Sequence, residues 1–247
     1  MDRITASQLD EFAVTRNVQQ LSRSEQFEAF AAYCVVAAEY DDEFDPAELR
    51  AGGGNDLGFD AIALIINGDL VEDIEEIRDL KERNNYLQAR LVIVQARTTS
   101  GFDSTTISDI ADNICDFFSE KPTLPMNAEI IAFKRLIDEL YSHSTSFRRG
   151  APQLVVRYVT TGTWDGDPHL SAKVNNAKSR ISHLNLFNSI DFQCMGAREL
   201  QALYRQAENT VEASFEFPNA IVLPEIEGVT EAHLGIAKAS EFLKLIT

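Results

Sequence analysis

Short apolar runs that alternate with segments of helical periodicity constrain the fold of this chain more than any other feature. Residues 91–94 (LVIV) and 154–161 (LVVRYVTT) are rich in β-branched side chains and too short for buried helices, so we expect both to be buried strands. Between them, apolar side chains at positions 107, 110, 111, 114, 117 and 118 recur at helical spacing. A strand, a helix and a strand in this order predict an α/β sheet that helices cover on both faces.

The segments around this unit extend the same pattern. A capping-box sequence at residues 22–25 (SRSE) begins an amphipathic helix that runs to residue 38. A glycine-rich loop at residues 52–58 precedes a strand over 59–66, and Asn67-Gly68 has the composition of a hairpin turn. Farther along we expect a charged helix over 74–86, a helix over 172–184, a strand over 190–194 and a helix over 198–207.

Composition divides the chain into a large N-terminal part and a short C-terminal part. We expect one domain over residues 1–208 and a smaller extension over 209–247 that begins a further region. Apolar periodicity over residues 232–246 predicts a helix that has no stop signal, so we expect the natural protein to continue past Thr247.

Charge and cysteine content bound the partners and the compartment. The 39 Asp and Glu outnumber the 22 Lys and Arg, and the net charge of −17 opposes general attraction to nucleic acid or anionic lipid, which leaves only a local patch for such a partner. The three cysteines form no C-x-x-C pair, no secretory signal is recognisable, and the longest uncharged apolar run, residues 29–38, is too short to cross a bilayer. We expect a cytoplasmic protein without membrane association.

Polar side chains occur where one predicted strand begins and another ends. Asp60 lies at the start of the first strand, whereas Gln95 and Arg97 lie at the end of the second and share a face, because residues two apart in a strand point the same way. If these strands pair antiparallel, the three side chains meet at one edge of an apolar sheet. An Asp carboxylate, a Gln amide oxygen and the intervening carbonyl then suit Mg²⁺ or Mn²⁺, which polarises a phosphodiester and activates a water molecule.

Glu28 is the expected further ligand, because it lies beside the apolar stripe of the first predicted helix. All four residues also have purely structural explanations. Asp60 could cap the glycine-rich turn, Gln95 and Arg97 could form a polar strand end that reaches solvent, and Glu28 could form a surface ion pair. The residue pattern leaves these alternatives open.

Four segments taken in order resemble a known family. Residues 53–62 (GGNDLGFDAI), then 94–97 (VQAR) with Gly101-Phe102, resemble the N-terminal part of the AIPR family, the abortive-infection phage-resistance proteins of bacteria. Residues 158–164 (YVTTGTW) and 223–229 (LPEIEGV) look like that family too, so the resemblance covers most of the chain.

The resemblance implies a restriction-endonuclease-like fold with a PD-(D/E)xK-type core, a mixed sheet flanked by helices. In that core the position of Asp60 binds metal, and the position of Gln95 supplies a second ligand in the glutamine variant of related nucleases. The position of Arg97 should be a lysine that assists the attacking water. An arginine keeps the charge, but a guanidinium stays protonated and so cannot act as a base. Residues 103–120 contain no Lys or Arg that could replace it.

Two functions from different classes follow. The first is a Mg²⁺- or Mn²⁺-dependent endonuclease domain of a phage-defence protein, acting on DNA or RNA through Asp60, Gln95 and Glu28, with Arg97 stabilising the developing charge. The second is a nuclease fold that has lost catalysis and serves as a recognition or assembly module for nucleic acid, for a defence-system partner protein or for a second copy of the chain. The arginine at position 97 and the net charge favour the second.

Overall fold

A computed structural model describes residues 1–47, 49, 51–148, 150–208, 221–222, 233–236 and 238. The chain forms two compact units, Met1–Arg205 and Gln206–Thr247. No helix within the described ranges is both long and apolar enough to cross a membrane. The elements in chain order are α1 (Arg3–Thr15), α2 (Arg23–Val36), β1 (Ala61–Ile66), β2 (Asp69–Leu70), α3 (Ile74–Asn84), β3 (Ala89–Arg97), α4 (Ser104–Phe117), α5 (Ala128–Ser142), the short 3₁₀ helix η1 (Ser144–Ser146), β4 (Gln153–Thr160), α6 (Pro168–Ser182), β5 (Ser189–Met195), α7 (Ala197–Glu208), β6 (Ile221–Val222) and β7 (His233–Leu234).

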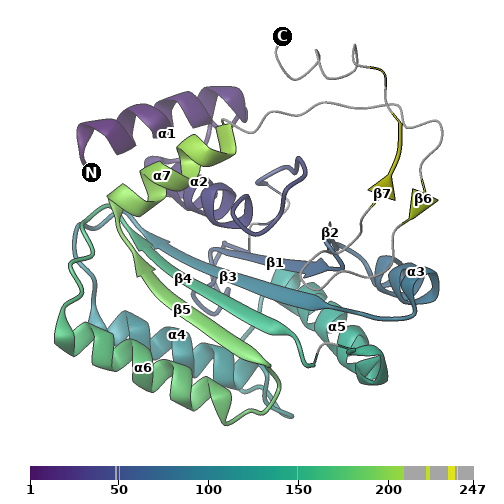
Figure 1. Ribbon diagram of the computed structural model, residues 1–247. Helices are drawn as coiled ribbons and strands as arrows, with labels where there is room; N and C mark the ends of the chain where they lie inside the picture. The colour runs from purple at the N-terminus through teal and green to yellow at the C-terminus, as the bar shows by residue number, and fades with distance from the viewer. Residues whose placement is uncertain are drawn as a thin grey trace. The chain divides into compact units, whose positions relative to one another are not determined.

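The first unit is built on a five-stranded sheet with the order β2-β1-β3-β4-β5 (Figure 1). Strand β1 runs antiparallel to both β2 and β3, whereas β3, β4 and β5 are parallel. Parallel neighbours require crossover connections, which α4 and α5 supply between β3 and β4 and α6 supplies between β4 and β5. The predicted α/β class with a mixed sheet flanked by helices is therefore confirmed.

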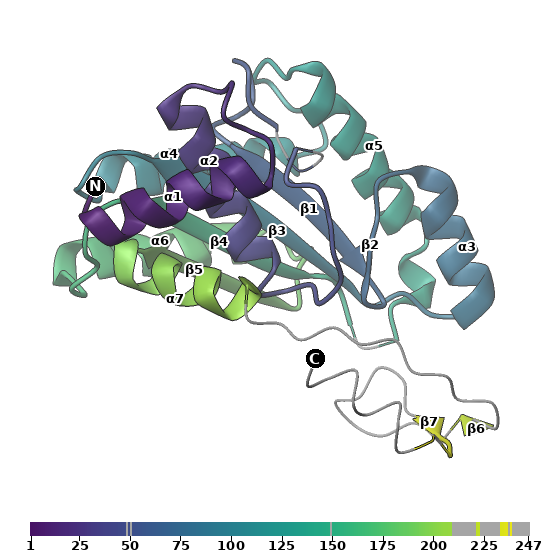
Figure 2. The same ribbon diagram turned by 90° about the horizontal axis from the view of Figure 1, so that it is seen from above.

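Helices lie on both faces of this sheet. Helices α1, α2 and α7 lie over one face, and α4 and α6 lie side by side over the other (Figure 1, Figure 2). Every residue of β1 is buried, as are nearly all residues of β3 and β4. Burial on both faces explains why these strands have continuous apolar sequences rather than an alternation of apolar and polar residues.

The local signals at the start of α2 and between β1 and β2 act as predicted. The Ser22 side chain accepts a hydrogen bond from the backbone N–H of Glu25, whose carboxylate accepts one from the N–H of Ser22. Asn67 and Gly68 have φ values of 56° and 98°, which are typical of a type I′ hairpin turn. This turn fixes the antiparallel register of β1 with β2.

Two helices, α1 and α5, are absent from the predictions. Each begins at a good N-cap, Asp2 for α1 and Asn127 for α5, whose side chains accept hydrogen bonds from the first backbone N–H groups. Each also buries a single stripe of apolar side chains. The signals needed to predict both helices are therefore present in the sequence.

The helix predicted over residues 232–246 is wrong where the structure describes that segment. His233–Leu234 forms strand β7, which pairs antiparallel with β6. Gly235, Ile236 and Lys238 have no regular secondary structure, and Gly235 interrupts the apolar repeat with a residue that disfavours helix. The remaining residues of this segment, and the family-like segment 223–229, lie outside the described residues.

Candidate metal-binding and catalytic site

Antiparallel pairing of β1 with β3 brings Asp60 and Gln95 together, as predicted. Ala61 pairs with Val94, so Asp60, one residue before β1, lies beside the end of β3. Nε2 of Gln95 donates to Oδ2 of Asp60 at 2.8 Å, and the backbone N–H of Ala96 donates to the same oxygen at 2.6 Å. Oδ1 of Asp60 therefore has no hydrogen-bond donor from the described part of the chain.

The glycine-rich loop closes tightly over Gln95. Leu57 and Gly58 have φ values of 58° and 66°, and Nδ2 of Asn113 on α4 donates to the carbonyl of Leu57 at 2.7 Å. A Cβ at position 58 would lie only 2.8 Å from Oε1 of Gln95. Glycine is therefore favoured at position 58, because a Cβ there would add backbone strain and push against the amide of Gln95.

Burial makes the carboxyl group of Asp60 unusually basic. Removal from water, the largest cause, acts with the nearby carboxylates of Glu28 and Asp56 to raise its pKa from 3.8 to about 7. The N–H of Ala96 and the charge of Arg97 lower the pKa by less than this. A cation placed beside Asp60 would favour the ionised form, so the environment suits a positively charged ligand.

Arg97 and Glu28 lie near Asp60 without contacting it. The Arg97 side chain is exposed and forms no hydrogen bond or ion pair with described residues, yet its charge lowers the pKa of both Asp60 and Asp103. Glu28 is half-buried on α2, where Oε1 accepts from the Ser24 hydroxyl at 3.1 Å. The four predicted residues thus form one hydrogen-bonded pair with two charged neighbours.

The oxygen donors around Asp60 have the chemistry that Mg²⁺ prefers, namely the carboxylates of Asp60 and Glu28 and the amide oxygen of Gln95. In the present geometry Oε1 of Gln95 faces Gly58, where a Cβ would lie only 2.8 Å from it. Within the described ranges, no three His, Cys, Asp or Glu side chains are grouped so as to hold a metal ion. A metal here would need the Gln95 amide to turn its oxygen toward Asp60 and Glu28 to leave Ser24. Asp60 and Gln95 are therefore the two residues of the candidate site that are already in contact.

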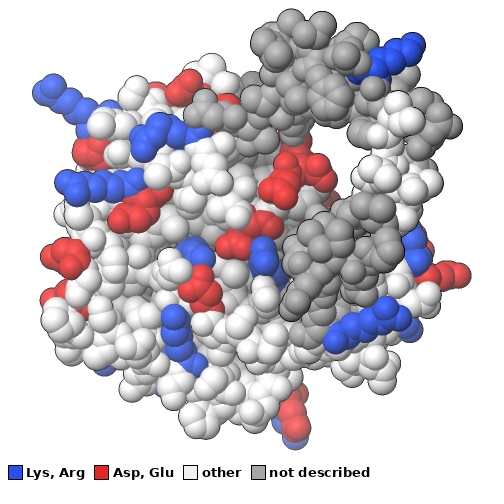
Figure 3. Space-filling view, in the orientation of Figure 1, with Lys and Arg blue, Asp and Glu red and all other residues white. Residues whose placement is uncertain are grey.

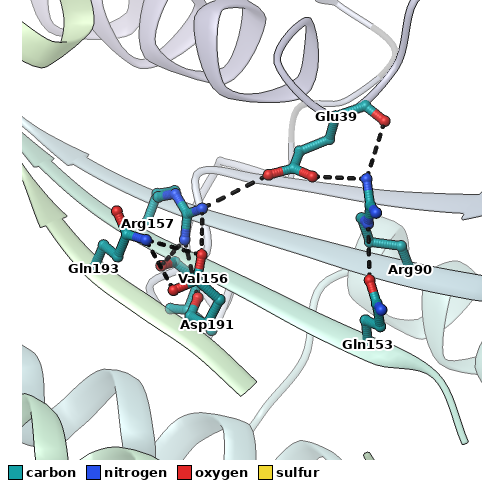
Figure 4. Close-up of polar contacts among 7 residues, drawn as sticks. All are labelled: Glu39, Arg90, Gln153, Val156, Arg157, Asp191 and Gln193. Atoms are coloured by element: carbon teal, nitrogen blue, oxygen red, sulfur yellow. Dashed lines mark hydrogen bonds and ion pairs between the residues drawn. The ribbon is translucent and has the colours of Figure 1, made fainter. Parts of the chain in front are cut away.

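A second polar cluster lies on the opposite face of the sheet, on the α2 side (Figure 4). The guanidinium of Arg157 on β4 donates to the Asp191 carboxylate at 2.7 Å and lies 3.6 Å from that of Glu39. Glu39, which follows α2, also accepts from Arg90 on β3 at 2.8 Å. Gln193 donates to Asp191 at 2.9 Å. Every charge in this cluster contacts an opposite charge, so its role is to tie the end of α2 to three strands.

An apolar pocket of about 300 Å³ lies apart from both clusters. Residues of β1, β2 and α5 line it, with Glu72 and Glu129 as its charged members. Neither Asp60 nor Gln95 belongs to this lining, which contains no His, Cys, Ser or Lys. The candidate chemistry therefore lies at the sheet edge and not in this pocket.

Two residues that shape the site, Asp56 and Asn113, were not predicted. Asp56 accepts from the N–H of Gly58 at 2.8 Å, and its place in the loop directly before Asp60 is a signal visible in the sequence. Asn113 contacts Leu57 across a separation of 56 residues, and no pattern in the sequence relates the two.

Comparison with known proteins adds no relative from which ligands or reactions could be transferred. The chain matches no protein-family model, no curated protein and no solved structure.

Proposed function

We propose that this chain is the nuclease-like domain of a bacterial phage-defence protein, with a restriction-endonuclease-like fold, and that it hydrolyses phosphodiester bonds of DNA or RNA with Mg²⁺ or Mn²⁺. One observation carries the proposal: Asp60 and Gln95 are in contact at 2.8 Å, at the sheet edge where Arg97 ends β3. The resemblance of residues 53–62 and 94–97 to the AIPR family supports it, since these two motifs meet in space.

Each residue has a separate role in this proposal. The carboxylates of Asp60 and Glu28 and the amide oxygen of Gln95 would hold the cation, whose chemistry when bound is polarisation of the phosphodiester. The exposed guanidinium of Arg97 stabilises negative charge that develops on the phosphate. Because a guanidinium stays protonated, Arg97 does not remove a proton from the attacking water.

The charge of the surface limits how nucleic acid can bind. On the face seen in Figure 3, basic side chains are scattered among acidic ones and form no continuous patch among the coloured residues. With a net charge of −17, general attraction to a polyanion is weak. Binding in this proposal therefore depends on local contacts near Arg97, to which the cation adds.

A cleavage assay tests the proposal directly. Purified chain is incubated with plasmid, single-stranded DNA and RNA, each with Mg²⁺, Mn²⁺ or EDTA. We expect metal-dependent cleavage by the wild type, its loss in Asp60→Ala, and its retention in the control Asp191→Asn, which removes a carboxylate from the second polar cluster. A wild type as inert as Asp60→Ala with every metal and substrate contradicts the proposal.

One feature favours a second candidate, a catalytically inactive recognition or assembly module that acts with a nucleic acid, a defence-system partner or another copy of the chain. Arg97 occupies the position where the resemblance calls for lysine, and α4, the next helix, contains no Lys or Arg. The substitution Arg97→Lys separates the candidates. Activity created by Arg97→Lys in an inert protein supports the module, and robust wild-type cleavage eliminates it.

A further inference from the structure

The loops that follow β3, β4 and β5 meet at the carboxyl ends of these parallel strands. The N–H of Thr161 donates to the carbonyl of Thr99 at 3.0 Å, and the N–H of Ala197 donates to the carbonyl of Gly162 at 2.7 Å. A Cβ at Gly162 would collide with the carbonyl of Ser100. The three loops are therefore joined backbone to backbone and present one fixed surface.

A row of aromatic rings connects this surface to the candidate site. Trp164, the single tryptophan of the chain, is half-buried, and its ring lies edge-on to Phe102 at a centroid distance of 5.0 Å. Phe102 in turn lies edge-on to Tyr158 at 5.4 Å. Tyr158 pairs with Gln95 between β4 and β3. One ring, that of Phe102, thus lies between Trp164 and Tyr158, which is the strand neighbour of Gln95.

We propose that Trp164 stacks on an unpaired base of the substrate, and that the domain therefore acts on single-stranded nucleic acid. This inference deepens the proposed function and rests on it. A tryptophan fixed by a neighbouring ring and by joined loops suits stacking, because a base needs a flat apolar face that keeps its position. Such stacking is possible only where the base is not already paired and stacked in a duplex.

The charges beside Trp164 indicate which part of a nucleotide it accepts. Asp165 and Asp167 follow it, and the Asp167 side chain caps α6 by accepting from the N–H of Leu170 at 2.9 Å. These carboxylates repel a phosphate, whereas an uncharged base is not repelled. Arg97 supplies the positive charge for the phosphate backbone of the nucleic acid. It pairs with Thr160 at the end of β4, four residues before Trp164.

Fluorescence measures this contact, because Trp164 is the sole source of tryptophan emission. The full chain is titrated at low ionic strength in EDTA with oligothymidylate, oligouridylate and a DNA duplex. We expect both single strands to quench the emission and the duplex to leave it nearly unchanged. Anisotropy of labelled single strands should show about tenfold weaker binding for Trp164→Ala and a much smaller change for Trp164→Phe.

Phe187→Ala is the matched control. Phe187 is also a half-buried aromatic residue, packed on Phe118 at a centroid distance of 5.0 Å, but it precedes β5 and so lies at the opposite end of the parallel strands. Its loss disturbs the same core without touching the proposed contact. Single-strand binding that weakens in Trp164→Ala and not in Phe187→Ala supports the inference. Absence of quenching, or equal losses in the two variants, overturns it.

The failure of this inference and that of the proposed function are distinguishable, because EDTA separates binding from hydrolysis. Single-strand binding that depends on Trp164, without any metal-dependent cleavage, removes the proposed hydrolysis and retains the stacking contact. Cleavage of duplex by wild type and Trp164→Ala at equal rates retains the hydrolysis and removes the stacking contact.

Discussion

Two polar clusters on the same sheet differ in whether their charged groups contact an opposite charge. On the α2 side, Arg157 contacts the carboxylates of Asp191 and Glu39. On the α4 side, the carboxyl group of Asp60 accepts hydrogen bonds from a neutral amide and a backbone N–H, and the nearest cation, Arg97, does not contact it.

This difference indicates that the first cluster is structural and that the second is a candidate for chemistry. In the first cluster a buried arginine, Arg157, has two carboxylate partners, as a buried charge needs if it is to stay ionised. A buried carboxyl group whose pKa rises to about 7 opposes folding when it is ionised, and such groups concentrate at functional sites. Neutralising one partner should therefore destabilise the first cluster and stabilise the second.

The largest effect is expected at the paired cluster. Arg157 is 8% exposed and contacts the carboxylates of Asp191 and Glu39. The substitution Arg157→Met removes the cation that these two carboxylates share. We expect the free energy of unfolding to fall by about 2–4 kcal/mol, measured by urea denaturation. This is less than for a fully buried pair, because the Asp191 side chain is 43% exposed and Glu39 keeps its contact with Arg90. Metal affinity at the Asp60 site should not change in protein that remains folded. A loss below about 1 kcal/mol would show that the pairing in this cluster contributes little.

The next effect is a pH-dependent one at Asp60. Its pKa is raised on folding, from 3.8 to about 7, so the neutral carboxyl group contributes stability below pH 4 that is lost as the pH rises through 7. Asparagine does not ionise. In EDTA, the stability of Asp60→Asn relative to wild type should therefore increase between pH 4 and 7 by a few kcal/mol and then level off. A stability difference that stays constant between pH 4 and 7 would show that folding does not raise the pKa of Asp60.

Substitutions at two glycines should change the stability by an intermediate amount. Gly58 and Gly166 have similar φ values of 66° and 76°, but only a Cβ at position 58 meets a side chain, that of Gln95. Gly166→Ala should cost about 1–2 kcal/mol from backbone strain alone. Gly58→Ala should cost about 1–3 kcal/mol more, because it also displaces the Gln95 amide. Equal losses in thermal or urea denaturation would show that the loop does not hold Gln95 in place.

The smallest effect on stability is expected at Arg97. Its side chain is exposed and has no hydrogen bond or ion pair with the described residues, so Arg97→Ala should change the free energy of unfolding by less than about 0.5 kcal/mol. The expected effect of Arg97→Ala is on catalysis, because the substitution should abolish whatever cleavage the wild type performs. A variant that unfolds more easily would instead indicate a structural role.

Strand periodicity and pairing direction account for the part of the site that was predicted from sequence. The contact between Asp60 and Gln95 follows from the apolar run of each strand, their antiparallel pairing and the polar residues at their ends. In contrast, the Asn113–Leu57 contact joins a helix to a loop, and the pairing of Arg157 with Asp191 joins two neighbouring parallel strands. Such contacts depend on how a helix packs and on which strand lies next to which, and neither is encoded in a local pattern.

Arg157 shows that the sequence also contains a signal for the second polar cluster. It interrupts the apolar run over residues 154–161, where a charge on a strand buried on both faces requires an opposite charge nearby. The sequence shows that such a partner must exist. Its identity depends on the neighbouring strand β5, and Glu39 reaches it from the end of α2.

Isothermal titration with Mn²⁺ and Mg²⁺ tests most directly whether Asp60 and Gln95 form a metal site. Wild type, Asp60→Ala and Asp191→Asn are titrated under identical conditions, so that a carboxylate is removed from each polar cluster in turn. We expect one saturable site in the wild type, its loss in Asp60→Ala and its retention in Asp191→Asn. Absence of binding in the wild type, or equal binding in all three proteins, would contradict the assignment.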